Sequence, residues 1–307
     1  MNKDLVTVII PVFNNIKDLN DSLKSVIDQT YDNIEIIIVD DGSNNHNEIL
    51  TICKNLKIET KIIKLKTNMG VSHALNMAII ESNGKYINWL PHDDMFCSTK
   101  IEDQINSLQG ANDKVSITNH AIININKITI STSNLNKKDF NNFKESLLIK
   151  DKYNYGTLLV PKKLYENNLF DEKLRYVQDY DMFIKLASIA RFTFVNKNLF
   201  LSKVHDQQSS KKYKEKWIDE KNKFYINFID DYYKIIIKKN LINMITVIFY
   251  IHYKNLLMLS DLLTKKIKKN NNLKIIIVNF LIFKIVKFIF LYKNNFLWNY
   301  FKQKFNK

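Results

Sequence analysis

The chain contains little glycine, proline and cysteine, and it has no long uninterrupted apolar run. Only five of its 307 residues are glycine and three are proline, so long flexible linkers are not expected. The two cysteines, Cys53 and Cys97, have no metal-binding spacing and fit a reducing compartment. No stretch reaches the roughly 18–20 apolar residues that a membrane-spanning helix needs. Met1-Asn2-Lys3-Asp4 leads directly into an apolar segment, so no signal peptide is expected.

Positive charge is concentrated at one end of the sequence. The formal net charge is +15, and 46% of the residues are hydrophobic. Residues 1–210 contain 25 basic and 25 acidic residues, whereas residues 211–307 contain 21 lysines and six acidic residues. The length is sufficient for two domains. We therefore expect a neutral domain over residues 1–210 and a basic region over residues 211–307.

Strand and helix patterns alternate in the first half of the chain. The expected strands are short, apolar and rich in β-branched residues, and they cover residues 5–13, 34–39, 61–65 and 86–90. Helical spacing covers residues 18–29, 49–56 and 71–80. This alternation predicts an α/β fold with a parallel sheet and right-handed crossovers. Ligands of such folds bind at the carboxyl ends of the strands.

The patterns are weaker in the remainder of the neutral domain. We expect two short strands within residues 115–130 and a loop over the site at residues 133–155. A short strand at residues 158–160, a helix at 179–190, and strands at 192–195 and 199–204 follow.

The basic region has aromatic residues at helical spacing with lysines between them. Residues 241–253 and 275–292 are mostly apolar but contain polar and charged interruptions. Basic helices with apolar faces are typical of helices that lie on an anionic membrane surface, and we expect that role for residues 211–307. An intramolecular bundle or a homo-oligomer contact is the alternative. A nucleic-acid surface ranks third, and no nucleic-acid partner is expected.

Two adjacent carboxylates, Asp93 and Asp94, follow the expected strand at residues 86–90. Neighbouring carboxylates repel each other and are costly to desolvate. A bound Mg²⁺ or Mn²⁺ removes both penalties, since hard cations prefer oxygen ligands. A solvated turn in which an aspartate caps the next helix explains the pair equally well.

Four segments occur in an order and spacing that resemble a known family. They are Val6–Asn15 (VTVIIPVFNN), Ile37–Ser43 (IIVDDGS), Asn68–Gly70 (NMG) and Leu90–Asp94 (LPHDD). Over about residues 5–210 they resemble the inverting family 2 glycosyltransferases. The resemblance implies the GT-A fold, in which helices flank a Rossmann-like, mostly parallel sheet. It also implies a nucleotide-sugar donor and a hydroxyl acceptor.

The resemblance implies a donor-binding role for several residues at the expected strand ends. Phe13 would stack on the base and Asp40 would accept a hydrogen bond from a base N–H, with uracil favoured over guanine. For Phe13 alone, an ordinary core position is the alternative. The full expected donor set is Pro11, Phe13, Asn14, Asp40, Asn68, Gly70, Asp93 and Lys203, of which Lys203 would neutralise diphosphate charge.

Metal binding and catalysis are also assigned through the resemblance. Asp93 resembles the metal-binding carboxylate of the family's Asp-x-Asp motif, and Pro91 replaces the first Asp, which puts a ribose contact in doubt. Asp93, Asp94 and His205 are the expected ligands of Mn²⁺ or Mg²⁺, and His205 has a phosphate contact as its alternative. Asp179 is the expected general base, although Gln178 replaces the usual Glu before it. A helix N-cap is the alternative for Asp179.

The expected function is metal-assisted, inverting transfer of a sugar, with UDP favoured in the donor. The acceptor would be a glycan or a lipid-linked precursor of a bacterial cell-surface polysaccharide or lipooligosaccharide. The expected location is cytoplasmic, peripheral on the inner face of the plasma membrane. A nucleotidyltransferase is disfavoured, since Asn14–Lys17 contains no glycine. A non-enzymatic membrane or nucleic-acid binding protein on a degenerate GT-A fold is the other alternative.

Overall fold

A computed structural model describes residues 3–140, 143–149, 153–206 and 208–231. The chain divides into two compact units. The first comprises Met1–Asn141 and Tyr153–Gln208, and the second comprises Asn142–Lys152 and Ser209–Lys307. The apolar segments at residues 241–253 and 275–292 lie outside the described residues. A membrane-surface role for residues 211–307, and a domain boundary at residue 210, stay predictions.

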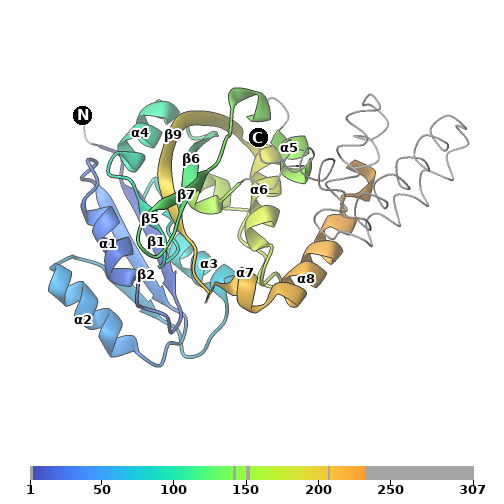
Figure 1. The fold of residues 1–307 in the computed structure, drawn as a ribbon. Helices are drawn as coiled ribbons and strands as arrows, with labels where there is room; N and C mark the ends of the chain where they lie inside the picture. The colour runs from blue at the N-terminus through green and yellow to red at the C-terminus, as the bar shows by residue number, and fades with distance from the viewer. Residues whose placement is uncertain (1–2, 141–142, 150–152, 207, 232–307) are drawn as a thin grey trace, which may run out of the picture. The chain divides into compact units, whose positions relative to one another are not determined.

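The first unit is built on a mixed sheet (Figure 1). Its described residues form nine strands in the order β3-β2-β1-β4-β8-β6-β9-β5, and β7 pairs with β6. The parallel part consists of β1 (Val6–Val12), β2 (Ile34–Asp40), β3 (Lys61–Lys64) and β4 (Tyr86–Trp89). All seven residues of β1 are buried, because β1 lies between β2 and β4. The four strands predicted in this half are confirmed.

Three helices connect the parallel strands, and all three were predicted. They are α1 (Leu19–Ile27), α2 (His46–Leu56) and α3 (Val71–Glu81). Leu19, Leu23 and Val26 of α1 are buried at helical spacing in the same core cluster as Val8 and Ile10 of β1. Connections of this kind bring the carboxyl ends of the parallel strands to one edge of the sheet.

The other part of the sheet is mostly antiparallel. It contains β5 (Met95–Phe96), β6 (Lys114–Ile123), β7 (Thr129–Thr132), β8 (Leu158–Pro161) and β9 (Arg191–Lys203). β8 joins the two parts by antiparallel pairing with both β4 and β6, whereas β6 and β9 are parallel. The helices here are α4 (Lys100–Leu108) and α6 (Gln178–Ile189), with short 3₁₀ helices at Lys137–Phe140, Tyr155–Thr157 and Lys162–Tyr165.

Two expectations for this half need correction, and one helix was not expected. β9 is one strand, not two, because shifts in its pairing with β6 near Asn119 accommodate the polar segment at residues 196–198. Residues 133–155 are not only loop, since they contain a 3₁₀ helix and α5 (Phe143–Ile149). Helix α4 was not predicted.

The described part of the second unit is helical. It contains α5, α7 (Ser209–Lys212) and α8 (Lys214–Ile226). The ammonium of Lys221 lies 4.3 Å from the centre of the Trp217 ring, which is a cation–π contact along α8. Of the helices in the described ranges, none has the length and apolar character needed to cross a membrane.

Candidate functional site

The polar residues singled out in the sequence gather at the carboxyl ends of the parallel strands. Phe13 and Asn14 follow β1, Asp40 ends β2, and Asp93 lies just beyond β4. The end of β9 reaches the same edge, because the backbone N–H of Lys203 donates to the Asp94 carboxylate at 2.8 Å. The sequence therefore places its unusual side chains on one side of the first unit.

The loops after β1 and β2 are joined by three hydrogen bonds. Asn14, with a left-handed φ of 57°, donates its N–H to the Ser43 hydroxyl at 2.9 Å. Its side-chain oxygen accepts from the N–H of Asn44, and its carbonyl accepts from the Asn45 side chain. Asn14 therefore holds the two loops together through its backbone N–H, its carbonyl and its side chain.

Phe13 is exposed at this joined loop. Its side chain is 43% exposed, so the core position that the sequence also allowed is excluded. An exposed ring beside the end of β2 is available for stacking on a flat ligand. Pro11, by contrast, is a buried member of β1 opposite Val39, and its donor contact stays a prediction.

Asp40 is fully buried and both of its carboxylate oxygens have partners. Oδ1 accepts the N–H of Ser43 at 2.8 Å, and Oδ2 lies 2.6 Å from Nδ1 of His46. His46 is 17% exposed and is the first residue of α2. A base contact by Asp40, which stays a prediction, would have to share an oxygen with these partners. Nothing in the local sequence pattern singles out His46.

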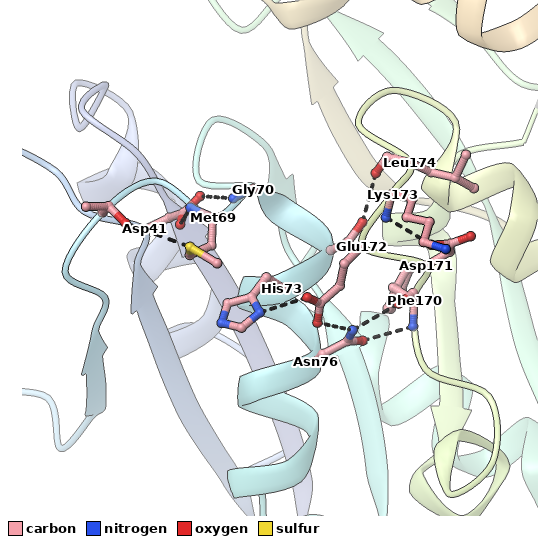
Figure 2. A network of polar contacts seen from close by, with 12 residues as sticks. Asp41, Met69, Gly70, His73, Asn76, Phe170, Asp171, Glu172, Lys173 and Leu174 are labelled. Atoms are coloured by element: carbon pink, nitrogen blue, oxygen red, sulfur yellow. Dashed lines mark hydrogen bonds and ion pairs between the residues drawn. The ribbon is translucent and has the colours of Figure 1, made fainter.

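Asp41 fixes the loop that precedes α3 (Figure 2). Its two oxygens accept the N–H groups of Met69 at 2.7 Å and Gly70 at 2.9 Å. Burial raises the pKa of Asp41, although these two N–H groups act in the opposite direction. The backbone donors at the start of α3 are thus occupied by a carboxylate of the protein, while Asn68 itself is exposed.

The close approach that Gly70 permits is used by another protein side chain. Nη1 of Arg175 donates to the carbonyl of Met69 at 3.0 Å, and a Cβ at Gly70 would lie 2.1 Å from this nitrogen. Gly70 also has a φ of 96°, which favours glycine. Arg175 was not singled out in the sequence, because nothing in its local pattern shows that it reaches a loop more than 100 residues away.

Asp93 and Asp94 have different environments despite being neighbours. Oδ2 of Asp93 lies 2.8 Å from Nε2 of His205, and the two side chains are 17% and 13% exposed. Asp94 is only 5% exposed and accepts the Lys203 N–H. Burial, followed by the nearby charge of Asp93, raises the pKa of Asp94 well above its usual value. Asp93 and His205 are therefore the accessible pair, and Asp94 anchors the end of β9.

The metal ligand set expected from the sequence is not assembled as one cluster. Within the described ranges, no group of three or more His, Cys, Asp or Glu side chains is placed to hold a metal ion. Asp93 and His205 offer one carboxylate oxygen and one imidazole nitrogen at adjacent positions, a donor set that suits Mn²⁺. These two side chains would leave the remaining ligand positions of a cation to other groups, and metal binding stays a prediction.

Lys203 is engaged with a residue that the sequence did not indicate. Its ammonium forms an ion pair with Asp18, and the two side chains are 9% and 12% exposed. Asp18 lies just before α1, so this pair joins the loop after β1 to the end of β9. Lys203 thus contacts Asp94 through its backbone N–H, and its positive charge is balanced by Asp18.

Asp179 lies in the first turn of α6, and the N-cap position is Val177. Asp179 is therefore not the N-cap residue that the sequence also allowed, although its Oδ1 accepts the N–H of Tyr180 at 2.8 Å within this turn. Its charge acts on Tyr155, whose pKa is raised well above the usual value mainly by burial. Tyr155 packs against Trp89 at the end of β4, with ring centres 5.6 Å apart. This contact connects the environment of Asp179 to the strand end that leads into Asp93.

Comparison with known proteins agrees with this architecture. The glycosyl transferase family 2 profile matches residues 7–172. An uncharacterized glycosyltransferase of Rickettsia typhi is 36% identical over 213 residues, which cover 67% of this chain and 66% of that protein. The UDP-Glc:α-D-GlcNAc-diphosphoundecaprenol β-1,3-glucosyltransferase WfgD of Escherichia coli is 28% identical over 68% of this chain and 80% of its own length.

A crystal structure of S. aureus TarS in complex with UDP-GlcNAc has a similar fold. It superposes with a TM-score of 0.57 at 17% identity, over 73% of this chain and 66% of that chain. The mixed sheet with flanking helices is thus a GT-A-like fold. The chain belongs to glycosyl transferase family 2. It spans about two thirds or less of the length of several of these relatives, and only 31% of one from Rickettsia bellii.

Proposed function

We propose that the protein transfers a sugar from a UDP-sugar to a hydroxyl of a glycan or lipid-linked acceptor, with inversion at the anomeric carbon. The observation that carries this proposal is the accessible Asp93–His205 pair at the same sheet edge as the exposed Phe13 ring. Two similar proteins support the choice of donor and acceptor. WfgD is named for a UDP-glucose donor and a diphosphoundecaprenol acceptor, and TarS binds UDP-GlcNAc.

In this proposal the donor nucleotide lies across the ends of β1 and β2. Phe13 stacks on the base. The buried Asp40, with His46 beside it, accepts a hydrogen bond from a base N–H. Asp93 and His205 would hold Mn²⁺ or Mg²⁺. When bound, such an ion supplies Lewis-acid stabilisation of the departing diphosphate. Lys203, near the same turn, adds positive charge.

Asp179 would act as the general base. Its carboxylate takes the proton from the acceptor hydroxyl while the hydroxyl oxygen attacks the anomeric carbon. Attack opposite the leaving diphosphate inverts the configuration in one displacement, so no covalent sugar–enzyme intermediate forms. The buried Tyr155 ring, which packs against Trp89, would help to exclude water from this end of the site.

The proposed acceptor is a precursor of a bacterial cell-surface polysaccharide on the inner face of the plasma membrane. The lysine-rich composition of residues 211–307 supports contact with an anionic membrane there. In α8, Lys214, Lys216 and Lys223 are exposed, whereas Phe224 and Tyr225 are buried, so this helix offers lysines to such a surface and not these aromatic rings.

Calorimetric titration of UDP tests the donor site. We expect binding to strengthen when Mn²⁺ is added, and Asp93→Ala to remove this metal-dependent gain. Asp113→Ala is the matched control, since Asp113 is exposed and pairs with Arg191 at the start of β9. UDP binding that is indifferent to Mn²⁺ and to Asp93→Ala would refute the assigned metal role. A lack of any UDP binding would refute the proposed donor.

A further inference from the structure

One face of α3 is attached to the segment that leads to Asp179 (Figure 2). Ser72, His73 and Asn76 lie at helical spacing on this face, and all three bond to residues of the segment 170–175. The segment ends three residues before α6 begins at Gln178. The helix that starts at the loop of Asn68–Gly70 therefore also holds the approach to the proposed base.

Asn76 makes the most complete of these attachments. It is 5% exposed, and its side-chain amide both donates to and accepts from the backbone of Phe170. Nδ2 donates to the Phe170 carbonyl at 2.9 Å, and Oδ1 accepts the Phe170 N–H at 2.9 Å. The Phe170 ring in turn packs edge-on against Trp89 and Tyr155, so Asn76 also fixes the aromatic residues beside Asp179.

Glu172 extends the attachment by one turn. Its carboxylate accepts from Nδ2 of Asn76 at 3.0 Å and lies 3.0 Å from Nδ1 of His73. These two bonds, with that from Asn76 the stronger influence, lower the pKa of Glu172. Glu172 is therefore held as an anion between two side chains of α3.

The other end of the segment is attached to the loop at residues 67–70 before α3, which we call the donor loop. Leu174 accepts a hydrogen bond from the Ser72 hydroxyl at 3.2 Å, and Arg175 bonds to the Met69 carbonyl over Gly70. Asp41 holds the same loop from the opposite side. A continuous set of bonds thus runs from the end of β2, through the donor loop and α3, to the residues before Asp179.

We propose that Asn76 is a positioning residue for the transfer step, acting by fixing the Asp179 segment relative to the donor loop. This inference rests on the proposed function of Asp179. Proton removal requires the base within hydrogen-bond reach of the acceptor hydroxyl, and a displacement of about 1 Å lowers the rate about 100-fold. Asn76 is buried and its side chain bonds to Phe170 and Glu172, so its replacement should affect the reaction rate and not donor affinity.

The test compares Asn76→Asp with Asn83→Asp in the full-length protein. Asn76→Asp keeps the acceptor for the Phe170 N–H but faces the Phe170 carbonyl and Glu172 with a second carboxylate. Asn83 offers a matched control, because it donates to Glu35 at 2.7 Å in an Asn–Glu pair beyond the far end of α3. Glu172→Ala, at a half-exposed position, gives a second variant that should fold.

We expect Asn76→Asp to lower kcat about 10- to 100-fold and to leave the donor KM within about twofold. A misplaced base should also raise the ratio of UDP-sugar hydrolysis to transfer. Glu172→Ala should change kcat and the ratio of hydrolysis to transfer less than Asn76→Asp does, and Asn83→Asp should change neither. Equal effects of Asn76→Asp and Asn83→Asp, or a parallel loss of donor binding and kcat, would overturn the positioning role.

Hydrogen exchange of the backbone amides at residues 170–179 provides a readout that needs no transfer activity. Asn76→Asp should speed exchange there, while the amides of β1 and β2 keep their protection. If the wild-type protein transfers no sugar, the proposed function fails. Unchanged exchange at residues 170–179 would refute the positioning role by itself.

Discussion

Adjacent aspartates at the end of β4 show how strongly a residue's role depends on its surroundings. Asp93 is partly accessible beside His205, whereas Asp94 is buried and receives the Lys203 N–H. The Ser22 hydroxyl of α1 lies within hydrogen-bond distance of the carbonyls of His92 and Asp94 in the same turn and can donate to either. The sequence predicted that this pair matters, but it contained no information to separate the two carboxylates, since that depends on α1 and β9.

His120 in β6 is expected to make stability dependent on pH. Burial lowers the pKa of His120 from 6.5 to about 4, and its Nδ1 has no hydrogen-bond partner in the described structure. The imidazole of His120 therefore becomes protonated below about pH 6.5 in the unfolded chain, but only below about pH 4 in the folded protein. Stability should fall by up to about 3 kcal/mol across this interval as pH decreases.

His120→Leu should remove this part of the pH dependence. Denaturant unfolding of both proteins between pH 7 and pH 4 measures this dependence. As the pH falls, the free energy of unfolding should decrease less in the variant than in the wild type. If the two curves stay parallel over this range, His120 is not the titrating group.

At the scale of elements, the turn after β2 needs a glycine because the backbone of the donor loop lies against it. Gly42 has a φ of 77°, and a Cβ there would lie 2.5 Å from the Thr67 carbonyl carbon and 2.8 Å from the Asn68 nitrogen. Gly110 has a similar φ of 74° but nothing within 4 Å of such a Cβ. Comparing substitutions at these two glycines therefore distinguishes the cost of backbone strain, which both share, from that of steric contact, which only Gly42 has.

Gly42→Ala should destabilise the protein more than Gly110→Ala does. Left-handed strain costs about 1–2 kcal/mol in each variant, and only Gly42→Ala must also displace the Thr67–Asn68 backbone. Thermal unfolding measures the difference, and UDP titration should show weaker binding for Gly42→Ala alone. Equal stability and equal UDP affinity in the two variants would show that the position of this loop does not depend on Gly42.

Helix α4 was missed although its apolar residues are correctly spaced for a helix. Ile101, Ile105 and Leu108 recur at i, i+4 and i+7 and pack into the core, and the polar Lys100 and Gln104 share their buried face. Gln104 is satisfied by the carbonyls of Ser116 and Thr157, which no local pattern reveals. The strands of the first half were predictable because each is a short apolar run with a polar end.

The same limit applies to the site. Residues at strand ends, such as Phe13 and Asp93, were found because the topology places strand ends together. Arg175, Asn76 and His46 were missed, since each acts through a contact with a segment distant in sequence or with a buried carboxylate. The contacts of Asn76 with Phe170 span 94 residues.

At the scale of the whole molecule, the neutral first 210 residues contain every residue assigned to the donor, the metal and the base. The excess of lysines lies in residues 211–307. This division of charge agrees with a catalytic domain that uses local carboxylates and a separate region that contacts an anionic surface. The chain belongs to glycosyl transferase family 2, and the proposed chemistry depends on Asp179.

The most direct test is sugar transfer by Asp179→Asn, measured together with UDP binding. Asp181→Asn is the control on the same turn, because Asp181 forms an ion pair with Lys185 at 2.8 Å. The account predicts that Asp179→Asn lowers transfer from a UDP-sugar about 10²- to 10⁴-fold with UDP affinity nearly unchanged. Transfer at the wild-type rate, or loss of UDP binding in equal measure, would contradict it.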